Sequence, residues 1–570
     1  MAGFAVSAVP VCALADDTGG SNSAAKTEGA KPAAKKPDAP APLTERERWL
    51  LDRIEELEKR VAELESKKGA SPAGVPAEAS SSASQVVSVE PPIGKTLASD
   101  STAATAVSPA PANANAVVEK SGKQEQAAAM PAKAEPFAFA DFTWLNGNAR
   151  TKEVPMDTKF FTPEIRADIS YIYDFNHPKD DSIGGSSEVF RSNEVHVTQL
   201  GVGGDFHYDN VRARLMTQFG MYAFTTPRND ASPSRGQWGL DTAYRYVSEA
   251  YGGYHFNALH GINVDAGIFM SYIGLFSYYN FDNWAYQPSF VSSNTPWFFN
   301  GVRVQIFPTE HLKIEPWFTN GWQSYGRFNN RPGFGVQILY RPTGWLSVLG
   351  NQYAFGEETL GVPGRVRYHS DDSLEIKYYD KPENFLSKAA FSLTGDIGCE
   401  HGGGVSCIGT RNGHPKQSFL GYMFYNRFWF DKDKYALTLG GGKINNPGRY
   451  LVLVPPINGA TASSAAINAP YFTGNPGDPF KAWDASGTID WMPSQYITFR
   501  WEFDHRAANV PYWSGPGGIT PPGGNNGFPT QFVCMDGSVA PAGGCGAIGL
   551  WTPDLKKIEN RINLAILVKF

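Results

Sequence analysis

The feature that most restricts the fold of this chain is a period-two alternation of apolar and polar residues, which recurs from about residue 165 onward. In the stretch ITFRWEF (497–503), the apolar side chains fall on one face, whereas Thr498, Arg500, Glu502 and the following Asp504 fall on the other. A period of two indicates a β-strand. A charged face of this kind does not belong in a soluble core, but it can line water inside a barrel.

About sixteen such segments can be counted, each of barrel-strand length. They start near residues 165, 195, 210, 244, 262, 296, 311, 333, 345, 366, 387, 418, 434, 481, 496 and 559. Pro316 lies within the seventh, which is the strand that the pattern supports least, because proline removes a ladder hydrogen bond.

The connections between these segments alternate in length. Short joins such as PTEH and MPSQ follow the even-numbered segments, and long joins follow most of the odd-numbered ones. This alternation is typical of an up-and-down membrane barrel, with short periplasmic turns and long outer loops. We therefore predict an all-β, antiparallel transmembrane barrel of about sixteen strands over residues 136–570. A soluble β-sandwich is the alternative. An even number of strands places both termini in the periplasm.

Composition supports a membrane barrel over a helical membrane protein. The chain has 36 Phe, 25 Tyr and 14 Trp, yet only Phe4 and Trp49 precede Phe137. This density suits the aromatic girdles of an outer-membrane barrel. Mean hydropathy is −0.32, and no apolar run after the N-terminus is long enough for a membrane helix. A net charge of −6 without a basic patch disfavours nucleic acid as a partner.

The N-terminal region contains four expected parts before the barrel. Residues 1–15 resemble a signal peptide with cleavage after Ala15, although no basic segment precedes the apolar stretch, so the start could lie upstream or the signal be absent. Cys12 would be removed with it. Residues 16–42 are expected to be disordered. Residues 43–68 are expected to form a coiled coil, and residues 69–135 form an Ala/Ser/Pro linker without aromatic residues.

The coiled-coil prediction rests on a capping box and a heptad seam. Thr44 and Glu47 form the box. The apolar seam consists of Leu50, Ile54, Leu57, Val61 and Leu64. Such a seam favours dimers. In contrast, RIEELE and RVAELE resemble the arginine–glutamate pattern of short trimeric coiled coils. We expect a homotrimer with periplasmic arms, whose tethering raises the effective concentration of the helices.

Two pairs of closely spaced cysteines predict two disulfides. Cys399 and Cys407 lie in CEHGGGVSC, and Cys534 and Cys545 lie in CMDGSVAPAGGC. Strand parity places both pairs in connections outside the cell, an oxidising location that favours local disulfides. A metal site is disfavoured because only the first pair has a nearby histidine, His401, and neither shows C-x2-C spacing.

Two stretches carry a family resemblance. The stretch DAGIFMSYIGLFSYYNFDNW (265–284) and the region from AWDASGTIDW (482–491) through PGGNNG resemble the OmpL-like family of β-barrel porins over about residues 140–570. The resemblance implies a pore-forming barrel in bacterial outer-membrane lipid, with no catalytic residue. Phe570 looks like the terminal aromatic residue that barrel insertion machinery reads. The arm looks like the periplasmic arms of some trimeric porins.

The polar faces of the strands supply the candidate pore lining. The candidates are Arg212, Arg214, Arg245, Glu249, Asp265, Arg303, Lys313, Glu315, Arg500, Glu502 and Asp504, with Asp168, Arg341, Glu375, Lys377 and Asp396 as further members. Opposite signs across a pore create a transverse field that passes polar solutes. The alternative is that these charges pair between neighbouring strands, for example Arg303 with Glu315. The aromatic segment 277–297 either enters the lumen as a constriction or caps the outside.

The expected function is passive diffusion of small hydrophilic solutes through a water-filled barrel with a mixed-charge lumen. The alternatives are an envelope tether that acts through the arm, and the barrel sheath of an electron-transfer conduit. The sequence YHSDDS superficially resembles a barrel-lipase site, but His369 and Ser370 are adjacent and so lie on opposite faces of a strand. No C-x-x-C-H motif is present, so the chain is not expected to bind a c-type haem itself. We expect no enzyme activity and no cofactor.

Overall fold

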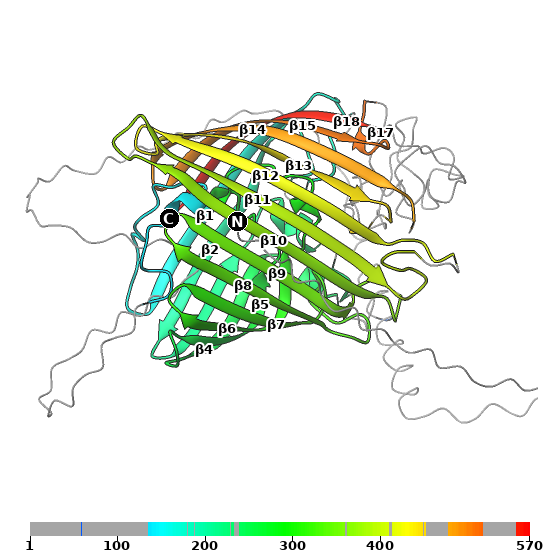
Figure 1. Ribbon diagram of the computed structural model, residues 1–570, viewed down its shortest axis with the longest axis horizontal. Coiled ribbons are helices and arrows are strands. Elements are labelled where there is room, and N and C mark those ends of the chain that lie inside the picture. The colour runs from blue at the N-terminus through cyan, green and yellow to red at the C-terminus, as the bar shows by residue number, and fades with distance from the viewer. Residues whose placement is uncertain are drawn as a thin grey trace, which may run out of the picture. The chain divides into compact units, whose positions relative to one another are not determined.

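The structure is a computed structural model, and its central feature is a closed barrel (Figure 1). It describes Lys59 and residues 135–178, 181–186, 189–227, 230–232, 239–359, 362–409, 413–448, 450–451, 477–516 and 555–570. The chain divides into two units, Met1–Asp100 and Ser101–Phe570, and every strand found among the described residues lies in the second. Lys59 is helical. The expected signal peptide, the expected disordered residues 16–42, the rest of the coiled coil and nearly all of the linker lie outside the described residues.

Sixteen antiparallel strands form the barrel wall, in the ring order β1-β18-β15-β14-β13-β12-β11-β10-β9-β8-β7-β6-β5-β4-β3-β2. Their bounds are β1 (Phe161–Asp174), β2 (Val195–Tyr208), β3 (Val211–Thr217), β4 (Val247–Phe256), β5 (Ile262–Met270), β6 (Phe298–Thr309), β7 (Leu312–Thr319), β8 (Gly333–Thr343), β9 (Leu346–Glu357), β10 (Val366–Asp380), β11 (Leu386–His401), β12 (Ser418–Phe430), β13 (Tyr435–Asn446), β14 (Phe480–Ser494), β15 (Ile497–Ala508) and β18 (Ile558–Lys569). The prediction of an up-and-down barrel of about sixteen strands is confirmed.

The described parts of the connections contain only short elements. They are the helices α2 (Tyr222–Thr225) and α3 (Leu240–Tyr244), the 3-10 turns η1 (Thr143–Leu145), η4 (Asn280–Asp282) and η5 (Ser292–Asn294), and a small sheet of β16 (Trp513–Ser514) with β17 (Leu555–Lys556). No described helix is long and apolar enough to cross a membrane.

The predicted alternation of connection lengths is present. The joins after β2, β6, β8 and β14 consist of residues 209–210, 310–311, 344–345 and 495–496, whereas the joins after β5, β13 and β15 span 271–297, 447–479 and 509–557. Because successive strands run in opposite directions, the short joins, which all follow even-numbered strands, lie at one end of the barrel. We call this the short-turn end.

Two placements made from the sequence need correction. Arg245 was expected on a strand, but β4 begins only at Val247, so Arg245 precedes the wall. Alternation continues through the residues before Val247, and this made the strand look longer than it is. Cys399 was expected in a connection, but it lies within β11, near the end of that strand.

Pro316 is accommodated inside β7 with a local interruption. It pairs with Val336 of β8. On the other side, the ladder between β6 and β7 has no pair between Arg303–Trp317 and Ile306–Ile314. The missing N–H of proline explains the gap, because the residue cannot donate to the ladder.

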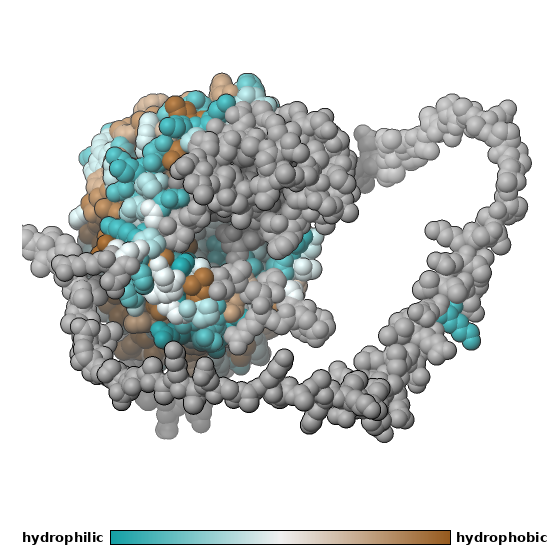
Figure 2. Space-filling view, turned by 90° about the vertical axis from the view of Figure 1, so that its right-hand side faces the viewer, coloured by the Kyte–Doolittle hydropathy of each residue, from teal (hydrophilic) through white to brown (hydrophobic). Residues whose placement is uncertain are grey.

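Burial alternates along the wall as a barrel in lipid requires. On β12, Leu420, Tyr422 and Phe424 are exposed on the outside, whereas Met423 and Tyr425 are 1% exposed and face inward. Figure 2 views the barrel from one end and shows hydrophobic residues, interspersed with polar ones, along its outer edge. Apolar side chains therefore face lipid and polar groups face the interior.

The ring closes where β18 pairs with β1 and β15. Ile165 N donates to Phe570 O at 3.1 Å, and Phe570 N donates to Ile165 O at 2.9 Å. The Phe570 ring stacks on Tyr496 with centroids 5.4 Å apart, and it is 44% exposed. Phe570 thus presents an accessible aromatic ring at the edge of the wall.

We expect Phe570→Ala to lower the amount of assembled barrel in cells while refolding in detergent stays nearly unchanged. The ring contributes little buried surface, and its expected role is recognition during insertion. Phe385→Ala, at another exposed aromatic residue (74%), is the matched control. Heat-modifiable mobility on gels measures assembly. Normal assembly of the Phe570 variant in cells would contradict this role.

Candidate pore and its inner segments

The connection between β5 and β6, residues 271–297, folds inside the barrel, and we call it the inner segment. Trp284, Tyr286 and Val291 are 5%, 2% and 0% exposed. Trp284 packs in a cluster with Trp429 of β12, whereas Tyr286 packs in another cluster with residues of β1 and β18. The segment therefore contacts several sides of the wall, as a constriction of the lumen would.

Glu502 of β15 anchors the backbone of the inner segment. Its two carboxylate oxygens accept the N–H groups of Tyr286 and Gln287, each at 2.6 Å. It also accepts hydrogen bonds from the Thr488 hydroxyl at 2.7 Å and from Asn563 Nδ2 at 3.0 Å. The buried carboxylate is thus fully hydrogen-bonded, as a charge in this location must be.

Arg500, two residues earlier on the same face of β15, holds carbonyl groups of the inner segment. Its guanidinium donates to Asn283 O at 2.7 Å and to Ala285 O at 3.0 Å. Asp490 of β14 balances its charge at 2.7 Å. Because Arg500 and Glu502 bind acceptors and donors respectively, β15 fixes both kinds of backbone group in the inner segment.

An ion-paired aspartate fixes the inner segment near the short-turn end. Asp282 lies 2.8 Å from Arg166 of β1 and 3.3 Å from Lys569 of β18. Burial raises the pKa of Asp282, but Arg166 and Lys569 outweigh burial and hold the pKa below its ordinary value. Asp282 is therefore ionised at neutral pH, and its stabilising contribution is lost only as the pH falls through this lowered pKa.

Residues 137–153, which precede β1, run across the short-turn end, and we call them the crossing segment. Phe137 N donates to Glu310 O in the β6–β7 turn at 2.8 Å, and Thr151 Oγ1 donates to Gln495 O in the β14–β15 turn at 3.1 Å. These turns lie eight strands apart in a ring of sixteen. The segment therefore spans the mouth between opposite sides.

The crossing segment and the inner segment are bonded to each other. Gly147 N donates to Asp282 O at 2.9 Å, and Arg427 of β12 donates to Gly147 O at 2.7 Å. A Cβ added at Gly147 would lie 2.3 Å from Phe281 O, so this approach requires glycine. Trp144 is fully buried and donates to Gly344 O at 3.1 Å. Both segments together narrow the lumen.

A cavity of about 410 Å³ lies beside the crossing segment at the short-turn end. It is lined by Ala140, Asp141, Gly344, Trp345, Lys377, Tyr378, Tyr379 and Asp380. Lys377 and Asp380 form an ion pair at 2.6 Å at its edge. Groups of both signs therefore border the space beside the crossing segment.

Most of the charged residues expected in the pore pair with neighbours on the wall. Asp265 contacts Arg212 at 3.3 Å and Arg303 at 3.0 Å. Lys313 and Glu315 pair at 2.8 Å. The expected example, Arg303 with Glu315, is not the ion pair that forms. Arg303 also lies over the ring of Phe269, with the guanidinium carbon 4.5 Å from its centroid.

The remaining expected residues also have partners or positions inside the barrel. Arg214 contacts Glu249 at 3.0 Å and also binds Asp205 and Glu164, which the sequence reasoning missed. Asp504 accepts a hydrogen bond from Asn563. Among the further candidates, Asp168 binds Asn280 and Tyr286 of the inner segment. Asp396 lies 2.9 Å from His369. Three more face the barrel interior toward the short-turn end: Arg341, Glu375 and Lys377.

Residues missed by the sequence reasoning include the buried pair Arg427 and Asp490, 2.7 Å apart and both fully buried. Arg427 occupies an inward position of β12, and Asp490 an inward position of β14. Strand parity identifies both as inward-facing. Their role in holding the crossing segment has no local signal, because Gly147 lies 280 residues from Arg427.

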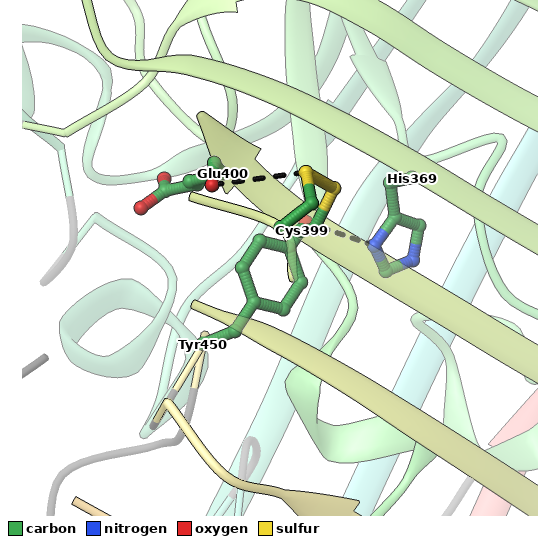
Figure 3. Close-up of a disulfide and its surroundings, with 5 residues drawn as sticks. His369, Cys399, Glu400 and Tyr450 are labelled. Atoms are coloured by element: carbon green, nitrogen blue, oxygen red, sulfur yellow. Dashed lines mark hydrogen bonds between the residues drawn. A yellow bond between two sulfur atoms is a disulfide. The ribbon is translucent and has the colours of Figure 1, made fainter. Parts of the chain in front are cut away.

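The first expected disulfide is present, between Cys399 and Cys407 (Figure 3). It joins the end of β11 to the connection that follows. Tyr450 Oη lies 3.1 Å from His369 Nδ1 on the inward side of β10, as Figure 3 shows. The second expected pair, Cys534 and Cys545, lies outside the described residues.

The residues considered for enzymatic chemistry are separated by the wall. His369 is 4% exposed and faces inward, whereas Ser370 belongs to the outward face of β10. The two therefore lie on opposite faces, as the strand period requires. Within the described part of the chain, no group of three or more His, Cys, Asp or Glu residues is arranged to hold a metal ion.

The chain is similar to known porins. The family model described as "Putative beta-barrel porin-2, OmpL-like" matches residues 166–535. No curated protein matches the sequence. Among solved structures, OmpT of Vibrio cholerae is 9% identical, with 73% of this chain and 100% of that chain covered and a TM-score of 0.38. The channel DcaP of Acinetobacter baumannii is 12% identical (72% and 96% covered, TM-score 0.38), and OprB of Pseudomonas putida is 10% identical (72% and 94% covered, TM-score 0.40).

We expect Glu502→Gln to loosen the inner segment and raise single-channel conductance. The amide cannot accept both backbone N–H groups as an ionised carboxylate does, and charged hydrogen bonds contribute about 1.5–3 kcal/mol each. Planar-bilayer recording measures the change. Glu383→Gln, in the exposed β10–β11 turn, is the matched control and should leave conductance unchanged. Equal conductance in both variants would show that Glu502 does not restrain the constriction.

We expect the double substitution Cys399→Ser and Cys407→Ser to lower the free energy of unfolding by about 2–3 kcal/mol. The estimate follows from the chain entropy of a short closed loop, with a sequence separation of 8 residues. Denaturant titration of the folded barrel measures it. A non-reducing peptide map of the wild-type protein is the control. Free thiols at both positions would rule out the bond.

Proposed function

Because this chain belongs to the OmpL-like family of β-barrel porins, we propose that it is an outer-membrane channel for passive diffusion of small hydrophilic solutes. The observation that carries the proposal is the chemistry of the inner wall. Arg212, Asp265 and Glu502 face inward from β3, β5 and β15, whereas the outward faces of the same strands are apolar. A wall of this kind solvates polar solutes on one side and lipid on the other.

Pairing of the wall charges supports weak selectivity between anionic and cationic solutes. Asp265 and its two arginine partners place both signs on a single patch of the wall. A pore with paired charges presents dipoles to a solute rather than a field of one sign. The channel therefore discriminates by polarity and size more than by the sign of the charge.

The two internal segments support a narrow passage. The inner segment is held to β15 by Arg500 and Glu502, and the crossing segment is held to opposite turns of the short-turn end. Solutes must pass around both. We therefore propose small solutes such as monosaccharides and amino acids as the transported class, with oligosaccharides excluded.

The assembly proposed around this channel follows from the sequence. The short-turn end faces the periplasm, together with the coiled-coil arm of residues 43–68 and the linker of residues 69–135. The arm and the barrel together form a homotrimer. Residues 1–15 serve as the signal peptide, and Phe570 is the mark that the insertion machinery recognises.

Liposome swelling tests the channel. Vesicles that contain the full mature chain should swell in isosmotic arabinose, glucose and glycine, and they should swell much more slowly in a trisaccharide. Anionic and cationic amino acids should enter at similar rates because the wall charges are paired. Heat-denatured protein is the control. Vesicles that do not swell in any of these solutes would refute diffusion and favour a tethering role, which pull-down with isolated cell wall then measures.

A further inference from the structure

The outward face of β9 and β10 carries a polar cluster where a lipid-facing wall should be apolar. Gln352 Nε2 donates to Ser370 Oγ at 2.8 Å and lies 3.2 Å from Asp372 Oδ1, and Ser370 Oγ donates to Asp372 Oδ2 at 2.9 Å. Gln352 and Asp372 are exposed. We call these three residues the outward polar patch.

The patch lies within the apolar band of the wall. On the same face of β10, Tyr368 and Tyr378 are 40% and 52% exposed, and they bracket Asp372 along the strand. Exposed tyrosines mark the interfacial girdles of a membrane barrel. Asp372 is therefore placed at the depth of the hydrocarbon, where a carboxylate that faces lipid is unfavourable.

Glycine flanks the carboxylate on both sides. Asp372 pairs with Gly350 of β9 and with Gly395 of β11. A Cβ built on Gly395 would meet nothing within 4 Å, so the surface beside Asp372 is open. A glycine inside a strand often marks a place where another backbone approaches closely.

The outward faces of β2 and β18 differ from this face. β2 lies eight strands from β10 in the ring, and its outward residues Leu200 and Val202 are exposed and apolar. The outward residues Leu564 and Ile566 of β18 are likewise apolar. Lipid tails pack against those apolar faces, but they offer no hydrogen-bond partner to the outward polar patch.

We propose that the outward face of β9–β11 is the surface through which copies of this chain associate in the membrane. The patch carries amide and hydroxyl donors together with a carboxylate acceptor, so it is complementary to itself. In the homotrimer proposed above, this face lies toward the threefold axis, where the same residues of neighbouring copies come together. Gln352 of one protomer can then donate to Asp372 of another, and the glycines allow the walls to approach. Small residues and polar groups act in this way between transmembrane helices.

A pair of glycine substitutions tests the surface without touching the interior. Gly395→Leu places a bulky apolar side chain in the proposed contact. Gly252→Leu, on the outward face of β4, is the matched control, because a Cβ there also meets nothing within 4 Å. We expect the mass in mild detergent to fall to that of a monomer for Gly395→Leu and to stay that of the wild-type oligomer for Gly252→Leu. An unchanged oligomer in both variants, or a monomeric wild-type protein, would overturn the proposal.

The double substitution Asp372→Leu with Gln352→Leu provides a second test. Heat-modifiable mobility confirms that the barrel is folded, and the oligomer should be lost because the polar contacts between protomers are removed. Liposome swelling should remain, since no inward residue is changed. Retained swelling with loss of the oligomer separates this proposal from failure of the channel itself. An oligomer that persists in the folded double variant would contradict it.

Photo-crosslinking keeps the test independent of folding defects. A benzophenone amino acid at Leu393, an outward residue of β11 that is 45% exposed, should yield covalent dimers of the chain. The same amino acid at Val202, on β2, should not. Equal yields at the two positions, or no dimers from position 393, would place the contact elsewhere.

Discussion

Backbone hydrogen bonding in a medium without water is the constraint on which the whole structure depends. Each strand that faces lipid must pair its N–H and C=O groups on both sides, and only a closed ring leaves no edge unpaired. The pairing of β1 with β18 provides the closure, and it runs from Arg166–Lys569 to Asp174–Arg561. Sixteen strands in a ring leave an interior wider than their own side chains fill. The inner and crossing segments occupy part of that space.

Buried charge inside the barrel is tolerated where the charged group has defined partners, as at Arg500 and Glu502. Removing a carboxylate or guanidinium from water is costly, and a good partner restores only part of that cost. Arg500 meets this demand with Asp490 and three backbone carbonyls, and Glu502 meets it with backbone N–H groups. The hydrogen bonds that compensate these buried charges on the wall therefore also hold the inner segment in place. Polar wall residues serve here as structural anchors, and in the proposed channel they also line the pore.

The wall was predictable from the sequence because each strand has a local period-two pattern of apolar and polar residues. Period two identified the polar face of β15, and the alternation of short and long joins identified the topology. Arg245 was misplaced because alternation ran past the true start of β4. The interior was less predictable. Aromatic composition alone could not decide between a constriction and an external cap for residues 277–297. The deciding contacts, such as Glu502 with Gln287, join residues 215 positions apart. The crossing segment had no signal at all, since its partners are turn carbonyls that every hairpin possesses.

The crossing segment has a consequence for the order of folding. It leads directly into β1, the strand that must find β18 at the opposite end of the chain. A sheet that is still open can receive the crossing and inner segments from the side, whereas a sealed ring admits them only through its ends. Contacts so distant along the chain also form slowly. Pairing of β1 with β18 is therefore the natural last step of assembly. If the ring closed earlier, the crossing and inner segments would be left outside an empty barrel.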